Sequence, residues 1–264
     1  MAHLEVETKD SITTLTMNRP ESRNALSDEM VQGLIDALHD AELDSNIRCV
    51  VLRGAGDHFL AGGDVKSFSR LFEMSDDEIR KNFVLRVHNL HPVMFAMRRM
   101  PKPIIASVRG AAAGAGVSIA LACDLIIASE DSFMTLAYCN IGASPDGSST
   151  YQLPRTLGIK KAMEIALLGD RFTAQEAKEM GLVNFVVPTD KLEEETLKLA
   201  TRLANGPTRA LANAKALLYR SIESQFEAQL QAEGEAFADS AASPDFKEGV
   251  MAFVEKRKPN FTGK

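Results

Sequence analysis

The stretch "PIIASVRGAAAGAGVSIALACDLIIAS" spans residues 103–129 and decides the fold class. Its ends, "PIIASV" and "DLIIAS", are short apolar runs typical of strands buried in a sheet. Between them, "VSIALAC" is typical of a short apolar helix. A strand, a turn of small residues, a helix and a second strand in this order predict an α/β architecture with a sheet covered on both faces.

Patterns on either side extend this architecture. Residues 4–17 alternate apolar and polar around a Lys-Asp-Ser break, which predicts a hairpin, and "CVVLRG" at 49–54 predicts another buried strand. Ser27 is suited to cap a helix, and a long helical region over 67–100 contains a Ser-Asp-Asp-Glu start signal.

The last part of the chain has a different character. From about residue 192 the pattern is helical, with breaks at "NGP" (205–207) and at "SPDF" (243–246), where Ser243 is suited to cap the last helix. We therefore expect an α/β core over residues 1–200 and a helical C-terminal segment over residues 201–264.

Composition narrows the class of function. The chain has 264 residues and a formal net charge of −6, which argues against a general nucleic-acid surface. The N-terminus lacks a signal-peptide pattern, and no stretch approaches the ~20 apolar residues of a membrane-spanning helix. Three cysteines at spacings that suit neither disulfides nor zinc favour a reducing, cytoplasmic location. His58, His88 and His91 also lack metal-site spacing, so we expect no metal and interpret them as surface or packing residues.

Two segments are unusually rich in small residues, "HFLAGGDVKSF" (58–68) and "RGAAAGAGVSIA" (109–120). Each run meets an apparent helix start, where free backbone N–H groups favour an anion. Close helix–strand packing is one explanation, and a dinucleotide fingerprint is a poor one because the glycine spacing fails. The third is that one N–H from each run stabilises a developing oxyanion.

A lone acid, Asp146, lies in "IGASPDGSST" (141–150) between a proline and a glycine. Pro-Asp-Gly is an ordinary turn sequence, so this residue alone does not indicate catalysis. Its context decides between a turn residue and a catalytic carboxylate.

The two small-residue segments, together with "LPRTLG", "LLGDRFTAQEAKEMGLVNFVV" and "FKEGVMAFVEKRKPNF", resemble the enoyl-CoA hydratase/isomerase, or crotonase, family over nearly the whole chain. The resemblance implies a spiral of β-β-α repeats and a helical C-terminal region used in trimerisation. It also implies a homotrimer, or a hexamer built from two trimers. Within the family the pattern is most similar to epoxyphenylacetyl-CoA isomerase of phenylacetate breakdown and to other enoyl-CoA isomerases.

The resemblance also implies site residues. The two N–H groups that hold the thioester oxygen match Gly63 and Ala115, the latter at a position that is usually glycine. Coenzyme A enters as part of the substrate, with no further cofactor. The implied coenzyme A contacts are Arg23, Ala25, Ala61, Asp64 and Lys66, with Phe237 and Lys256 from a neighbouring subunit.

The chain departs from the hydratase pattern at both catalytic glutamates, where Ser118 and Tyr138 stand as candidate substrate-binding residues. Neither is a good base near neutrality. Asp146 occupies a position where ordinary hydratases have glycine but certain isomerases and a dehalogenase have aspartate, and this chain lacks the tryptophan of the dehalogenase pattern. We therefore favour an enoyl-CoA isomerase with Asp146 as acid and base. The alternatives are a hydratase with a displaced acid and a non-catalytic acyl-CoA-binding subunit that partners a related hydratase.

Overall fold

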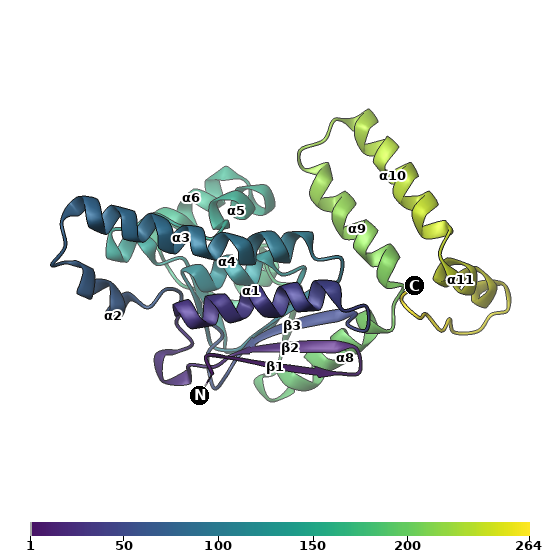
Figure 1. Cartoon of the computed structure of the whole chain (residues 1–264), viewed down its shortest axis with the longest axis horizontal. Helices are drawn as coiled ribbons and strands as arrows, with labels where there is room; N and C mark the ends of the chain where they lie inside the picture. The colour runs from purple at the N-terminus through teal and green to yellow at the C-terminus, as the bar shows by residue number, and fades with distance from the viewer. Residues whose placement is uncertain (1) are drawn as a thin grey trace.

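A six-stranded sheet forms the centre of the computed structural model, which describes residues 2–264 (Figure 1). Its strands, in spatial order, are β1 (Leu4–Lys9), β2 (Ile12–Met17), β3 (Cys49–Gly54), β4 (Ile104–Val108), β6 (Leu125–Ser129) and β9 (Phe185–Val187). β1 and β2 form the expected antiparallel hairpin, and every later pairing is parallel.

The two faces of this sheet bury different sets of side chains, because successive residues of a strand point to opposite sides. In β3, Val50 and Leu52 join the larger core cluster, whereas Cys49 and Val51 join a smaller one. The helix α8 (Leu192–Ala204) covers the smaller cluster, and α1 (Asp28–Leu43) lies on the other side of the sheet (Figure 1). The prediction of an α/β sheet covered on both faces is confirmed.

A second, three-stranded sheet lies beside the first, and one of its strands is followed by a segment of the candidate active site. Its strands are β5 (Ala111–Ala113), β7 (Phe133–Thr135) and β8 (Phe172–Thr173). Gly114 follows β5 directly and leads into α4 (Ala115–Ala122). The other helices of the α/β body are α2 (Val65–Phe68), α3 (Asp76–Arg99), α5 (Ser149–Leu157), α6 (Ile159–Leu168) and α7 (Ala174–Glu179).

Helix starts follow the cap chemistry in the sequence. Ser27 Oγ accepts a hydrogen bond from Met30 N at the start of α1, and Ser75 forms a capping box with Glu78 at the start of α3. Such caps satisfy N–H groups that the first turn of a helix leaves without partners. The predicted caps in these two places are confirmed.

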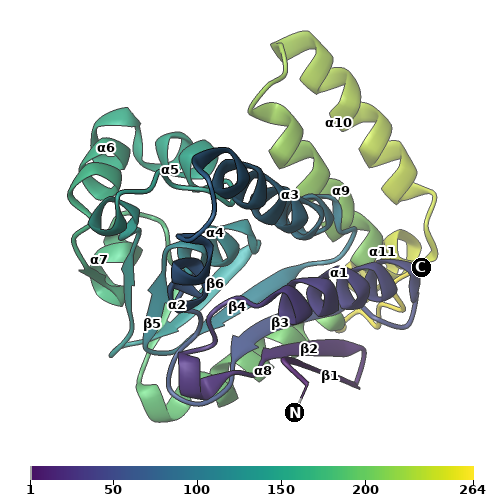
Figure 2. The same ribbon diagram turned by 60° about the vertical axis from the view of Figure 1, so that its left-hand side comes forward.

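The C-terminal helices are α9 (Thr208–Ser221), α10 (Phe226–Ala241) and α11 (Pro244–Val254). α9 and α10 form an antiparallel pair that extends away from the α/β body (Figures 1 and 2). Ser243 caps α11, as predicted, by accepting from Phe246 N. α8 still packs on the sheet and ends before Asn205, while the division at residue 200 and the trimerisation role remain predictions.

One buried ion pair ties this helical segment to the body. Lys215 Nζ on α9 donates to Asp124 Oδ2 at 2.8 Å and to the carbonyl oxygen of Met97 at 2.9 Å. Only 9% of the Lys215 side chain is exposed, so these partners take the place of the water that its buried ammonium group has lost. Across residues 2–264, no helix has the length and apolar character needed to cross a membrane.

Candidate active site

A cavity of about 1130 Å³ opens where the two small-residue segments meet. Its wall includes residues 61–63 from the first segment and 113–115 from the second, with residues from α1 and α3 on the other sides. Tyr138 and Asp146 also line it. The cavity thus collects the two proposed N–H donors and the lone acid, which are far apart in the sequence.

Glycines allow the two segments to come this close. Leu60 and Ala112 form a parallel bridge, and a Cβ atom on Gly116 would lie 2.2 Å from the carbonyl oxygen of Leu60. Gly62 has a φ of +88°, and a Cβ there would lie 2.8 Å from Ala113 O and 3.3 Å from the Ala115 nitrogen. Close packing of the segments, one of the open explanations, is therefore real, and it is also what brings the two N–H groups together.

The N–H groups of Gly63 and Ala115 are available to a ligand. Within residues 2–264 neither donates a hydrogen bond, although both residues line the cavity. Ala115 is the first residue of α4 and has ordinary helical geometry, so alanine replaces glycine there without strain. A pair of free donors at a helix start can stabilise a negatively charged oxygen.

Asp146 is held by Tyr138. The Tyr138 hydroxyl donates to Asp146 Oδ1 at 2.6 Å, while Asp146 Oδ2 accepts from none of the described residues. Burial, and then the charge of Asp146, raise the pKa of the Tyr138 phenol above its usual value. Tyr138 therefore stays protonated near neutrality and acts as a donor, so within this pair Asp146 is the group that can accept a proton.

Ser118 lies behind this pair and is fully buried. Its hydroxyl donates to the backbone carbonyl oxygen of Asp146 at 2.8 Å, and it is not among the residues that line the cavity. Gly147, with a φ of +59°, packs so closely that a Cβ there would lie 2.9 Å from Ser118 Cβ. In this arrangement Ser118 supports the Asp146 turn from behind, so the structure does not place it where we expected a substrate contact.

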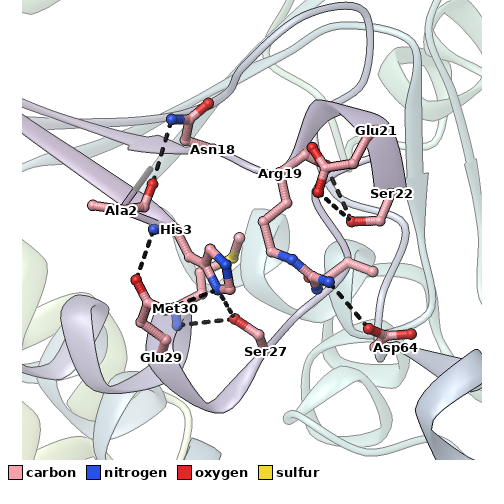
Figure 3. Close-up of polar contacts among 11 residues, drawn as sticks. Ala2, His3, Asn18, Arg19, Glu21, Ser22, Ser27, Glu29, Met30 and Asp64 are labelled. Carbon is pink, nitrogen blue, oxygen red and sulfur yellow. Dashed lines mark hydrogen bonds and ion pairs between the residues drawn. The ribbon is translucent and has the colours of Figure 1, made fainter.

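Among the predicted coenzyme A contacts, Ala61 alone lines the cavity, while Arg23, Ala25 and Asp64 are neighbours in sequence or contact of residues that do. The Ala61 N–H donates to the carbonyl oxygen of Arg23 at 3.0 Å. Asp64 forms an ion pair of 3.2 Å with Arg19, whose guanidinium also donates to the carbonyl oxygen of Ala25 (Figure 3). Arg19, which no sequence pattern singles out, thus ties this loop to the segment around Asp64.

Three further predicted contacts, Lys66, Phe237 and Lys256, also lie outside the cavity wall. Lys66 is an exposed residue of α2. Phe237 on α10 is 67% exposed and packs edge-on against Phe246, and Lys256 is exposed just after α11. Because we expect both to act on a neighbouring subunit, their roles remain predictions.

The sequence pattern favours surface or packing roles for His88 and His91, but both line the cavity from α3. Their rings lie 5.1 Å apart, and their spacing of three residues puts them on one helix face. This spacing predicts from the sequence that the two histidines share a helix face, although it does not predict that the face lies toward the cavity. Among residues 2–264, no group of three or more histidine, cysteine, aspartate or glutamate side chains is placed to hold a metal ion.

The sequence profile of the enoyl-CoA hydratase/isomerase family matches residues 7–264. The chain belongs to this family. It is 36% identical over 264 residues to 1,2-epoxyphenylacetyl-CoA isomerase of Escherichia coli strain K12, covering 100% of this chain and 98% of that protein. It is also 36% identical over 261 residues to a probable enoyl-CoA hydratase of Rhodobacter capsulatus, covering 99% and 98% of the two chains.

The fold agrees with this membership. The crystal structure of an enoyl-CoA hydratase from Polaromonas sp. JS666 superposes with a TM-score of 0.92 at 34% identity, covering 98% of this chain and 99% of that one. The predicted crotonase fold is thereby confirmed, as is the expectation that this chain is an enzyme of the enoyl-CoA hydratase/isomerase family. Because the relatives include both an isomerase and a hydratase, the choice of reaction depends on the site residues.

Proposed function

We propose that this protein is an enoyl-CoA isomerase that moves a double bond between the β,γ and α,β positions of an acyl-CoA. The observation that carries the proposal is the placement of Asp146 in the same cavity as the free N–H groups of Gly63 and Ala115. These groups are what a one-base isomerisation needs: a site for the charged thioester oxygen and one carboxylate.

The reaction then has two proton transfers. Asp146 Oδ2 takes the α proton, and the electrons of that C–H bond form a dienolate whose charge develops on the thioester oxygen. The N–H groups of Gly63 and Ala115 stabilise that charge. Asp146 then returns the proton at the γ carbon, which completes the double-bond shift and restores the carboxylate.

Tyr138 has a supporting role in this proposal. Its hydroxyl occupies Asp146 Oδ1, so the free Oδ2 is the atom that exchanges the proton. The raised pKa of Tyr138 argues against its use as the base that activates water in a hydratase. The two groups together favour proton shuttling over addition of water.

The remaining expectations become part of the same proposal. We infer that the coenzyme A moiety lies along the edge formed by Arg23, Ala25, Ala61, Asp64 and Lys66. Phe237 and Lys256 would contact it from a neighbouring subunit of a trimer, alone or within a hexamer, in the cytoplasm. These assignments rest on the family resemblance, and the exposure of Phe237 and Lys256 is consistent with them.

The test replaces Asp146 with asparagine and measures isomerisation of a 3-enoyl-CoA beside hydration of a 2-enoyl-CoA. We expect the wild type to isomerise faster than it hydrates, and Asp146→Asn to lose roughly 10²–10⁴-fold in isomerisation. Asp170→Asn, at an exposed aspartate outside the cavity, is the matched control. Faster hydration would favour the hydratase alternative, and acyl-CoA binding without any turnover would favour the non-catalytic subunit.

A further inference from the structure

A second cavity of about 450 Å³ lies beside the first. His91 and Ser148 line both, so the two cavities adjoin at these residues. Ser148 is two residues after Asp146, so the second cavity begins close to the carboxylate of the proposed reaction. A substrate that extends past Asp146 would therefore meet the second cavity.

Four helices line this second cavity. From α3 come His91, Met94, Phe95 and Arg98, whose spacing puts them on one face of the helix. α4 contributes Ala122, α5 contributes Tyr151, and α9 contributes Tyr219. Figure 2 shows α3 running between α5 and α9.

The wall on α9 is fixed in place. Lys215 precedes Tyr219 by four residues on the same helix face, and its ion pair with Asp124 and its bond to Met97 O attach that face to the body. A wall that is already attached to the body needs less ordering when a ligand binds.

The charges in the second cavity already compensate each other. The Arg98 guanidinium lies 4.5 Å from the centre of the Tyr219 ring and 5.1 Å from that of Tyr151. It donates to the Tyr151 hydroxyl at 3.1 Å, and that hydroxyl donates in turn to the Glu223 carboxylate. Glu223 lies 3.9 Å from Arg98, so the positive charge has its own counter-ion and does not call for an anionic ligand.

We propose that the second cavity binds the distal end of the acyl group, and that this end is an uncharged aromatic ring. The inference rests on the proposed function, because it takes the acyl chain to start at the Asp146 site. Phe95 is 54% exposed and lines the cavity. Arginine side chains lie over the faces of the two tyrosine rings, so the tyrosines offer their edges for edge-to-face contacts. An acyl end with a carboxylate would instead compete with Glu223 for Arg98.

The test uses saturated acyl-CoAs, which cannot isomerise, with the full chain in calorimetric titrations. The aryl ligands are 4-phenylbutanoyl-CoA and 6-phenylhexanoyl-CoA, each compared with the linear acyl-CoA of equal carbon number. We expect at least one aryl ligand to bind roughly tenfold more tightly than its linear partner. Phe95→Ala and Tyr219→Ala should remove this preference for the aryl ligand and leave the affinity for butanoyl-CoA unchanged. The control Leu218→Ala, at an exposed position of α9, should change neither the preference nor the affinity.

A second arm tests the charge argument with dodecanedioyl-CoA, which ends in a carboxylate. Glu223→Gln leaves Arg98 without its counter-ion, so we expect this variant to bind the ligand roughly tenfold more tightly than the wild type. The proposal is overturned if dodecanedioyl-CoA is the tightest ligand of the wild type, if Glu223→Gln gains nothing, or if aryl and linear ligands bind alike. Butanoyl-CoA binding with no aryl preference would refute this inference alone, whereas no binding of any acyl-CoA would refute the proposed function as well.

Discussion

Replacing Tyr138 with phenylalanine deletes the hydroxyl that donates to Asp146 Oδ1 at 2.6 Å and leaves the ring in place. A hydrogen bond to a charged group contributes about 1.5–3 kcal/mol. The deletion also leaves Asp146 Oδ1 without a donor among the described residues. The free energy of unfolding of Tyr138→Phe should therefore be lower than that of the wild type by about 1.5–3 kcal/mol.

The assays are urea unfolding and kcat/KM for a 3-enoyl-CoA, each measured for the wild type, Tyr138→Phe, Asp146→Asn and the double variant. In kcat/KM, Tyr138→Phe should lose less than about tenfold, because Asp146 still carries the proton. An unchanged free energy of unfolding in Tyr138→Phe would refute the stabilising contact between the two residues. A loss of kcat/KM as large as that of Asp146→Asn would make Tyr138 itself the acid or base, and full additivity in the double variant would show that the two act separately.

Three further predictions concern the backbone, the buried ion pair and the tail. Gly62→Ala places a Cβ 2.8 Å from a neighbouring backbone carbonyl oxygen at a residue with positive φ. It should lower kcat/KM by about tenfold or more and the free energy of unfolding by about 1–2 kcal/mol. Gly234→Ala, in open space, should instead raise the free energy of unfolding by about 0.5–1 kcal/mol. Asp124→Ala leaves the Lys215 ammonium without its counter-ion, and urea unfolding should show a loss of about 3–5 kcal/mol. Hydrogen bonds from an arginine hold the pKa of Glu248 at about 2, below its usual value of 4.5. The stability that the Glu248 carboxylate provides is therefore complete above about pH 4.5 and is lost as the pH falls toward 2. The melting temperature of Glu248→Gln, measured against pH, should not show this loss.

Much of the fold could be predicted because its signals are local. The hairpin, the buried strands and the caps at Ser27, Ser75 and Ser243 each depend on residues within a few positions of one another. The small-residue runs likewise indicate free N–H groups, because each run adjoins a helix start within a few residues. Such features are set by backbone chemistry and need no knowledge of tertiary packing.

The rest depends on contacts between distant segments. Arg19 and Asp64 are 45 positions apart in the sequence, and no local pattern near either residue predicts their ion pair. Tyr138 and Asp146 are eight positions apart, and the chain between them turns through a positive φ at Gly142. The orientation of the His91 face of α3 follows from packing on the body, which a helical pattern alone does not specify.

The tight packing of Ser118 against Gly147 has a consequence for how such enzymes diverge. A glutamate at position 118 is a much larger side chain than the buried serine, and the Asp146–Gly147 turn stands in its way. A lineage that acquires the glutamate must first, or at the same time, rebuild the turn that carries the aspartate. A glutamate at position 118 and the Asp146–Gly147 turn thus compete for one volume, so exchange between them requires linked changes at neighbouring sites.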